Sequence, residues 1–504
     1  MARRKFAAPL AMDLFRPLQR DGAVLLADQL IERVAGLIAT GRLAPGEFLP
    51  PLRLLAAKLK VNVGTVAKAY EALCARDLVA PDSTRGLRVR RRVVATPQSG
   101  TALAGLLMTP TVPADPLGTA LPHPTGARVV RFHVSEPGVD LMPARLVEDG
   151  LKAALADAGG LRYAPLSGLP HAHAAVEAYL RRRGVAVADA DILLTTGTTQ
   201  SLAVVTRALL PTGGVVLAEH PTWHVALSVF AAAGARVVAV PVDEQGLQTS
   251  VLPDAVLRHN PAFLYLQPAF QNPTGVSLSA ERRAAIMALA RKYQLPIVED
   301  DFAGEVGFSA PSPPLRNADG SETVIYLKSF AKLIAPALRV GILVAPARYA
   351  AAFRRIQHGL DPFVPAITQR ALAFCLTSPR FEEHLTALRA ALAERWAALD
   401  RALRRQMPAG MSWTHPSGGF CAWLTLPARM SPDDFIRDAA KRGVDLAPGR
   451  LFCLDDSGNR GLRLAFAAVT PGEIKYGVDV MARLIDSSAR ARRGGQRLPT
   501  PVAP

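Results

Sequence analysis

The sequence has few cysteines and no long apolar run. Its four cysteines lie far apart, without a CxxC pair or clustered histidines, which argues against a disulfide framework and a structural zinc site. No uninterrupted apolar run approaches the roughly 18–20 residues that cross a membrane. The basic N-terminus lacks the apolar segment and cleavage site of a signal peptide. We therefore expect a cytoplasmic protein with reduced thiols, no bound metal and no membrane partner.

Positive charge is concentrated in the first fifth of the chain. The 504 residues carry a formal net charge of +17, and residues 1–95 alone contain 17 Lys and Arg against 8 Asp and Glu. The length and the 50% apolar content indicate two to four globular domains. A basic small domain joined to a near-neutral large one suggests a polyanion partner, although a solvated basic surface has the same composition.

Residues 1–91 have the pattern of a small, mainly helical domain. Apolar residues at helical spacing predict a helix from Asp28 to Thr40, with Gly41 as its C-cap. Two more helices and two short strands are expected at Leu52–Leu59, Val63–Ala75, Leu78–Val79 and Leu87–Val89. The order of helix, helix-turn-helix and hairpin is that of a winged helix-turn-helix.

Beyond a linker rich in Pro and Gly at residues 92–127, strands and helices alternate. This alternation predicts an α/β domain over residues 128–484 with a largely parallel sheet. Its strands are expected at Ile192–Thr195, Val215–Ala218, Val237–Val240, Phe263–Leu266, Ile297–Val298, Val324–Leu327 and Ile342–Val344. A smaller α+β lobe is expected from about residue 360, and residues 485–504 are expected to form a disordered basic tail.

Four short segments near strand ends carry polar groups suited to a ligand site. Thr195–Gln200 places small residues at a helix start, where free N–H groups bind anions. Gln271–Gly275 offers an Asn where open α/β sheets bind ligands. The three acids Glu299–Asp301 would need a nearby cation if they are buried. Lys332 lies seven residues before Arg339 and is suited to imine formation. Taken singly, each is equally an ordinary turn, a solvated acidic loop or a surface lysine.

In this order the four segments resemble the fold-type I aminotransferases, which use pyridoxal phosphate (PLP). The resemblance spans roughly residues 129–484. It implies that Lys332 forms the Schiff base, that Asp300 pairs with the pyridine nitrogen and that Asn272 donates to the phenolic oxygen. The phosphate ligands and the ring-stacking aromatic residue that it implies are Thr198, Thr199, Ser329, Arg339 and Trp223.

Two further matches and two departures concern single residues. Tyr163 matches a tyrosine that reaches the phosphate from a second subunit, which implies a homodimer with shared sites. Arg463 matches the arginine that binds the substrate carboxylate. Phe302 replaces a tyrosine hydroxyl near the phenolic oxygen, which is expected to raise the pKa of the internal aldimine and weaken turnover. His173 stands where relatives have an arginine, and we expect it to be structural.

The N-terminal domain resembles the GntR family of winged-helix repressors, most clearly in Gly41–Pro50 and the helix that follows Asn62. A GntR domain linked to an aminotransferase-like domain is the arrangement of the MocR-type regulators. The resemblance implies DNA contacts from the recognition helix and the wing. The residues expected near DNA are Arg53, Asn62, Gly64, Thr65, Lys68, Arg85 and Arg88. Asn62-Val63 and Pro51-Leu52 depart from the family pattern, so the operator or the binding strength is expected to differ.

The leading hypothesis is a PLP-dependent transcriptional regulator. An amino-acid-like effector would form an external aldimine on the cofactor, and Arg463 would hold its acid group. Differential binding to two conformations would then change the affinity for double-stranded operator DNA. The alternative is an active PLP-dependent aminotransferase with an appended DNA-binding domain. A DNA-binding protein with an inactive cofactor fold is disfavoured, because Lys332 and Asp300 are intact.

Overall fold

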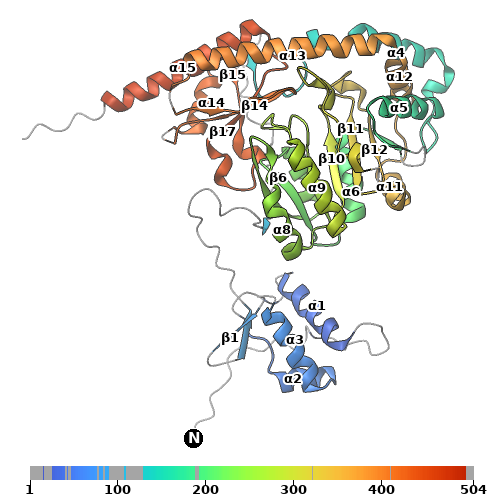
Figure 1. Cartoon of the computed structure of the whole chain (residues 1–504), viewed down its shortest axis with the longest axis vertical. Coiled ribbons are helices and arrows are strands. Elements are labelled where there is room, and N and C mark those ends of the chain that lie inside the picture. The colour runs from blue at the N-terminus through green and yellow to red at the C-terminus, as the bar shows by residue number, and fades with distance from the viewer. Residues whose placement is uncertain are drawn as a thin grey trace, which may run out of the picture. The chain divides into compact units, whose positions relative to one another are not determined.

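The computed structural model describes residues 15, 25–39, 43, 47–75, 79–82, 86–89, 107–108, 129–187, 192–319, 322–408, 410–428 and 430–494. The chain forms two compact units, Met1–Ser99 and Gly100–Pro504 (Figure 1). None of the helices in the described ranges has the length and apolar character needed to span a membrane.

The described part of the N-terminal unit is a winged helix-turn-helix. Its elements are α1 (Leu26–Ala39), α2 (Leu52–Leu59), α3 (Val63–Ala75), β1 (Val79–Asp82) and β2 (Gly86–Val89). The helices predicted at residues 52–59 and 63–75 are confirmed. Lys60, with φ of 54°, ends α2 in the left-handed conformation. Leu30 of α1, Leu55 of α2 and Val66 of α3 meet in a closed core. The expected C-cap Gly41 lies outside the described residues.

The large unit is built on a mostly parallel sheet, as predicted. Its strands, in spatial order, are β3 (Leu107–Met108), β7 (Arg236–Asp243), β6 (Val215–His220), β9 (Phe263–Leu266), β10 (Ile297–Asp301), β11 (Val324–Ser329), β12 (Gly341–Val344) and β5 (Ile192–Thr195). The two strands β3 and β12 run antiparallel to their neighbours, and the pairs among β7, β6, β9, β10 and β11 are parallel. All seven strands predicted from the sequence are present.

Helices cover both faces of this sheet because alternate strand residues point to opposite sides. On β6, Val216 packs with α6, α7 and α11, whereas Val215 packs with α8 and α9. The bounds of these helices are α6 Thr198–Leu209, α7 His224–Ala232, α8 Leu252–His259, α9 Ala280–Tyr293 and α11 Ala347–Leu360. The layered arrangement is visible in Figure 1, where the strands lie between the helices.

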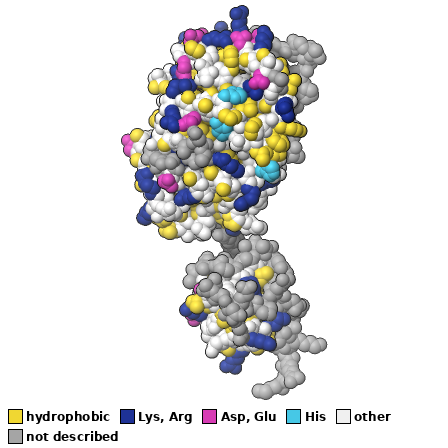
Figure 2. All heavy atoms as spheres, turned by 90° about the vertical axis from the view of Figure 1, so that its right-hand side faces the viewer, with side chains coloured by type: hydrophobic (Ala, Val, Ile, Leu, Met, Phe, Trp, Pro, Cys, Tyr) yellow, Lys and Arg dark blue, Asp and Glu magenta, His cyan; other side chains and the backbone are white. Residues whose placement is uncertain are grey.

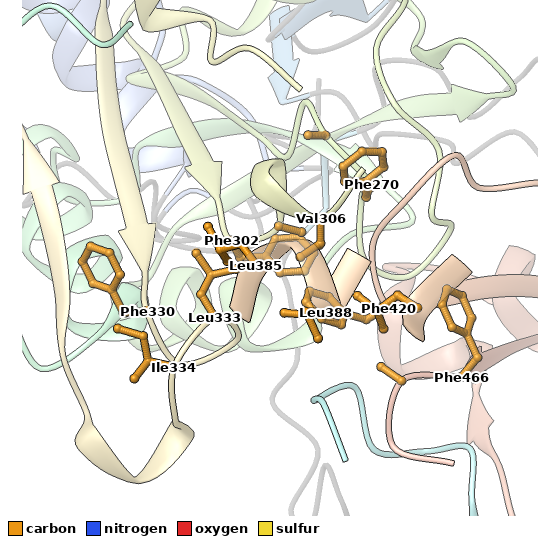
Figure 3. Close-up of a cluster of buried hydrophobic side chains, with 14 of the residues drawn as sticks. Phe270, Phe302, Val306, Phe330, Leu333, Ile334, Leu385, Leu388, Phe420 and Phe466 are labelled. Carbon is orange, nitrogen blue, oxygen red and sulfur yellow. The ribbon is translucent and has the colours of Figure 1, made fainter. Parts of the chain in front are cut away.

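The C-terminal lobe is a separate antiparallel sheet packed with long helices. Its strand order is β13 (Ser412–Trp413), β14 (Cys421–Thr425), β17 (Gly461–Ala465) and β16 (Ala447–Pro448). β15 (Val444–Asp445) pairs with β4 (Val130–Arg131). The helices of this lobe are α13 (Pro379–Gln406), α14 (Pro432–Ala440) and α15 (Pro471–Gly494). A separate group, α4 (Ala144–Ala156), α5 (Pro170–Arg182) and α12 (Ala366–Thr377), packs together, with α5 against β5 of the large sheet. One apolar cluster joins this lobe to the large sheet, and Phe302, Phe330 and Phe420 belong to it (Figure 3).

Two sequence-based boundaries need correction. Leu107 and Met108, inside the segment expected to be a linker, form β3 on the edge of the large sheet, opposite Val238 and Val237. The tail expected to be disordered from residue 485 begins inside α15, which continues to Gly494. Ile485 is buried beside Met481, so the apolar face of the helix runs past the expected boundary.

Candidate functional site

The polar segments singled out in the sequence follow strands of the large sheet. Thr198 begins α6 after β5, Asn272 follows β9, Asp300 lies near the end of β10, and Lys332 follows β11. Because the carboxyl ends of parallel strands meet at one edge of a sheet, the topology brings these residues to a common region.

Asp300 is a buried carboxylate with one unused oxygen. Its side chain is 1% exposed, and its Oδ2 accepts hydrogen bonds from the Tyr265 hydroxyl at 2.8 Å and from Gln267 Nε2 at 3.1 Å. Its Oδ1 is buried without a hydrogen-bond partner in the described part of the chain. Burial raises the pKa of Asp300 to about 6, against the opposing effect of these two donors. The free oxygen fits a protonated nitrogen such as that of a pyridine ring.

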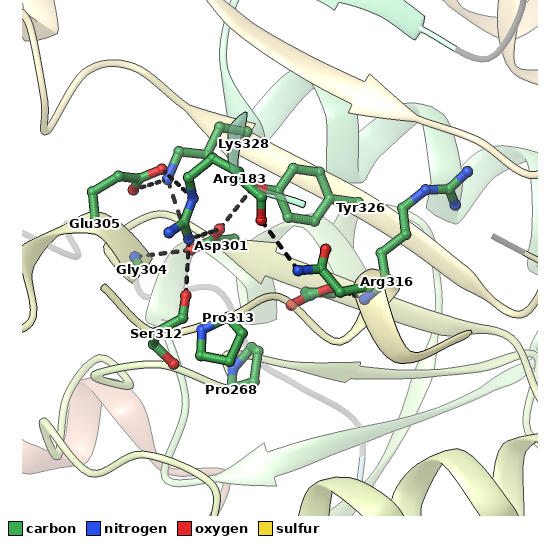
Figure 4. A network of polar contacts seen from close by, with 12 residues as sticks. Arg183, Pro268, Asp301, Gly304, Glu305, Ser312, Pro313, Arg316, Tyr326 and Lys328 are labelled. Carbon is green, nitrogen blue, oxygen red and sulfur yellow. Dashed lines mark hydrogen bonds and ion pairs between the residues drawn. The ribbon is translucent and has the colours of Figure 1, made fainter. Parts of the chain in front are cut away.

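The neighbouring acids of β10 are occupied elsewhere. Glu299 accepts from the backbone N–H groups of Leu315 at 2.7 Å and Arg316 at 3.0 Å. Asp301 lies 3.3 Å from Arg183 Nη2 and 3.7 Å from Lys328 Nζ, within the polar network of Figure 4. Burial opposes ionisation of Asp301, but these two cations hold its pKa at about 2. The expectation that the acidic run meets a cation therefore holds for Asp301.

The turn before α6 gathers groups that suit an anion. Gly197 has φ of 120°, and a Cβ at this position would lie 3.1 Å from Arg339 Nη2, so the guanidinium rests against the turn. Thr198 Oγ1 is buried without a hydrogen-bond partner among the described residues, and Thr199 is half-buried next to it. The Ser329 hydroxyl accepts from Ala331 N at 3.2 Å. A helix N-terminus, an unused hydroxyl and a guanidinium together fit a phosphate.

Lys332 lies in a loop anchored by Phe330 and Leu333, each 1% exposed (Figure 3). Burial lowers the pKa of Lys332; Arg463 and Arg339 lower it further, and Glu136 opposes them. A lysine whose neutral amine is favoured in this way is suited to attack a carbonyl carbon. The residues of the site thus fit PLP, from its ring nitrogen to its phosphate.

Asn272 and Arg463 link the two lobes. Arg463 Nη1 donates to Asn272 Oδ1 at 3.1 Å, and Arg463 also donates from Nη2 to the carbonyl of His133. The guanidinium lies 4.9 Å from the centre of the Phe452 ring and is 4% exposed. Its Nε is buried without a hydrogen-bond partner in the described ranges. A buried cation with spare donor capacity fits a carboxylate ligand.

The remaining predicted residues lie apart or have other contacts. Trp223 is partly buried at the start of α7, against the apolar cluster of α6 and β6. Tyr163 is 83% exposed and contacts Phe363, with ring centroids 4.6 Å apart, so this chain alone does not bring it into the site. Phe302 packs against Phe420, with ring centroids 6.2 Å apart. His173 contacts the carbonyl of Ser167, which agrees with a structural role.

The residues expected near DNA lie on the surface of the N-terminal unit. Arg53, Asn62, Gly64, Lys68 and Arg88 are exposed, Thr65 is half-buried, and Arg85 lies outside the described residues. The Asn62 side chain accepts from Gly64 N at 2.8 Å, so it caps the start of α3. This contact gives Asn62 a structural use that the sequence-based expectation did not include.

Sequence reasoning missed the groups that hold the expected site residues. Tyr265 and Gln267 position Asp300, and the Gln267 side chain also accepts from Asn272 N at 3.0 Å. His133 and His224 lie beside Arg463, and burial followed by the charge of Arg463 lowers the pKa of His224 to about 4. The alternation of β9 could have indicated Tyr265, since it shares a face with Phe263.

The fold and site together define a PLP-dependent protein joined to a winged helix-turn-helix. The class I and II aminotransferase family matches residues 129–481, and the bacterial regulatory proteins of the gntR family match residues 26–89. The chain therefore belongs to the class I and II aminotransferase family, and its N-terminal gntR domain makes it a MocR-type member that binds DNA and PLP.

Two kinds of protein are similar to this chain: regulators that match over nearly its whole length, and aminotransferases that match over about 72% of it. The probable rhizopine catabolism regulatory protein MocR of Rhizobium meliloti is 28% identical, over 92% of this chain and 94% of its own. The regulator TauR of Rhodobacter capsulatus is 29% identical, over 91% and 96%. The structure of the α-aminoadipate aminotransferase LysN of Thermus thermophilus, complexed with N-(5′-phosphopyridoxyl)-L-leucine, matches with TM-score 0.68 and 30% identity, over 72% and 93%.

Replacement of Tyr265 by Phe is expected to weaken PLP binding. The change removes a donor that favours ionised Asp300, so the pKa of Asp300 rises above about 6. Because the ring nitrogen needs the ionised form, affinity at neutral pH should fall by about 10-fold, and the loss of affinity on acidification should begin at higher pH. Absorbance titration of the full-length apoprotein across pH measures both effects. Tyr349→Phe on α11 is the matched control, and an unshifted pH profile for Tyr265→Phe would contradict the assignment.

Proposed function

We propose that the protein is a PLP-dependent transcriptional regulator that senses an amino-acid-like compound in its aminotransferase-like domain. The observation that carries this proposal is a pair of buried side-chain oxygens without a hydrogen-bond partner among the described residues, in one chain with a winged helix-turn-helix. They are the carboxylate Oδ1 of Asp300, which can accept, and the hydroxyl Oγ1 of Thr198, which can donate. The first oxygen suits the ring nitrogen of the cofactor and the second suits its phosphate. A chain that binds both DNA and a reactive carbonyl cofactor can couple the two.

The proposed cofactor contacts follow from the geometry of the site. Lys332 would carry PLP, Asp300 would hold its ring nitrogen and Asn272 would face its phenolic oxygen. Thr198, Thr199, Ser329 and Arg339 would hold its phosphate, and Trp223 would stack on its ring. PLP itself supplies a carbonyl that reacts with primary amines and a ring that withdraws electrons. The protein residues bind and orient this group and keep Asp300 away from water.

The effector is proposed to contain a primary amine and an acid group. Arg463 is buried, keeps an unused Nε, and makes a hydrogen bond to Asn272 that a carboxylate or sulfonate could replace. One small ligand is proposed to reach both Arg463 and Lys332, whose pKa is lowered by burial and by the charge of Arg463. A ligand that binds two conformations of the chain differently would change DNA affinity by the ratio of its two affinities.

Phe302 favours ligand binding over rapid turnover. It provides no hydroxyl, and its ring packs against Phe420. An active aminotransferase remains the second candidate function, supported by the complete set of Lys332, Asp300 and Asn272 and by the 30% identity to the solved LysN enzyme. Release of a keto acid from an amino-acid substrate would distinguish this function from sensing.

A homodimer is the proposed assembly, acting in the cytoplasm on double-stranded operator DNA. Leu161 and Tyr163 are 76% and 83% exposed. Figure 2 looks onto the side of the large unit where Figure 1 labels α5, α11 and α12. Apolar side chains gather on this side. Such a surface suits a partner subunit. Tyr163 would then complete the phosphate site of that partner.

Replacement of Lys332 by Ala is expected to abolish the response to effector while leaving basal DNA affinity intact. In the wild type, one compound of an amino-acid panel should change the affinity for an in-vitro-selected duplex by about 5–150-fold. Fluorescence anisotropy with the full-length protein measures this change. Lys292→Ala on α9 is the control and should respond normally. A Lys332→Ala protein whose DNA affinity still changes with the effector would contradict the sensing proposal.

Loss of Arg53 or Lys68 should weaken DNA binding through phosphate contacts. Each side chain is exposed on the helix-turn-helix. Substitution of either by Ala should lower the affinity for the selected duplex, and the slope of log affinity against log salt should decrease by about one. The Lys292→Ala variant removes the same charge from the large unit and should keep the wild-type slope. Unchanged slopes for both single variants would refute these DNA contacts.

A further inference from the structure

Three potential metal ligands meet beside the cofactor and effector groups without belonging to them. His220 ends β6, and Cys453 and Asp455 follow the short helix η8 (Gly449–Phe452). One ligand atom from each residue lies within 4.8 Å of the other two. Within the described part of the chain, this is the one group of at least three His, Cys, Asp or Glu side chains with that spacing.

The contacts of this cluster bring together a thiol, an imidazole and a carboxylate. His220 Nε2 lies 2.9 Å from Asp455 Oδ1 and 3.0 Å from Ser457 Oγ. The His220 side chain is 8% exposed and that of Asp455 is 13% exposed. His220 Nδ1 is buried without a hydrogen-bond partner among the described residues. A His–Asp hydrogen bond accounts for two of these groups, and Ser457 is a hydrogen-bond partner of the Cys453 thiol. Neither contact occupies the second ring nitrogen of His220.

The donor atoms of His220, Cys453 and Asp455 indicate which class of cation they would bind. Asp455 supplies a carboxylate, whose Oδ1 accepts from Ser457 N at 3.0 Å. Sulfur and nitrogen ligands favour zinc-type ions, whereas Mg²⁺ and Ca²⁺ prefer oxygen ligands alone. A thiol binds a metal as its thiolate, so the metal must displace the proton of Cys453 on binding.

We propose that His220, Cys453 and Asp455 bind a divalent zinc-type cation. Three protein ligands leave the fourth tetrahedral position to water. Sequence spacing does not reveal this site, because 235 positions separate His220 from Asp455. Its ligands differ in spacing from the CxxC and clustered-His arrangements of structural zinc sites. The proposal does not depend on the sensing function.

The three residues lie in segments that border the pocket around Arg463, so a metal bound there would affect that pocket. The segment that carries Cys453 is joined to the end of β6 by a hydrogen bond from Thr222 N to the carbonyl of Phe452 at 2.9 Å. The ring of Phe452 contacts the Arg463 guanidinium at 4.9 Å and the His224 ring at 5.4 Å. A metal bound by His220 and Cys453 would therefore fix Phe452, and with it one wall of the pocket around Arg463.

Metal analysis of the full-length, PLP-loaded protein after equilibrium dialysis against Zn²⁺ tests the proposal. We expect one Zn²⁺ per chain in the wild type, and binding at least about 10-fold weaker in Cys453→Ser and in Asp455→Asn. Cys74→Ser, which alters a half-buried thiol of the N-terminal unit, is the matched control and should bind as the wild type does. The Co²⁺-loaded wild type should also show a thiolate-to-cobalt charge-transfer band that Cys453→Ser lacks.

Two results would overturn the proposal. One is the absence of stoichiometric Zn²⁺ from the wild type. The other is equal Zn²⁺ binding by the wild type, Cys453→Ser and Asp455→Asn, which would place the ion elsewhere, for example on the cofactor phosphate. Zn²⁺ should also raise the thermal midpoint of the wild type but not of Cys453→Ser, and this midpoint without metal reports whether each variant is folded.

Discussion

The burial of the Asp300 carboxylate is the constraint on which the site depends. A carboxylate this far from water is stable as an anion only with donors around it. Tyr265 and Gln267 satisfy one oxygen and leave the other for a ligand. Gln267 also receives the N–H of Asn272, whose side chain in turn receives Arg463. One chain of hydrogen bonds thus runs from the centre of the large sheet to β17 of the C-terminal lobe.

The three consecutive acids of β10 show how neighbouring carboxylates are kept in separate roles. Glu299 accepts backbone N–H groups, and Asp301 is paired with Arg183 and Lys328. Both pairings are internal to the protein, so neither acid competes with Asp300 for the ligand. Phe302, next along the chain, turns into the apolar cluster shared with the C-terminal lobe. Along the chain, an acid with a free oxygen therefore lies between two acids with internal partners, and a core residue follows.

Local periodicity predicted the strands and most helices, because these depend on local pattern. The roles of the candidate site residues came from the family resemblance and stay predictions. Asp300, Asn272 and Lys332 follow strands that the apolar runs already indicate. The partners of these residues come from distant segments and have no local signal, as the pairing of Asn272 with Arg463 illustrates. The extension of α15 past residue 485 and the strand at Leu107–Met108 were missed because both depend on contacts with distant segments inside the large unit. The proposed role of Tyr163 needs a second subunit, and a local pattern in the sequence carries no signal for one.

The central claim is that ligand binding at the PLP site and DNA binding are coupled in one molecule. Its most direct test records the visible absorption spectrum of the PLP-loaded protein and its affinity for a selected duplex in the same titration with amino acids and ω-amino acids. The account predicts that one compound produces a lasting spectral change, and that DNA affinity changes over the same concentration range. A spectral change accompanied by steady release of keto acid, with constant DNA affinity, would contradict the account and identify the protein as an aminotransferase.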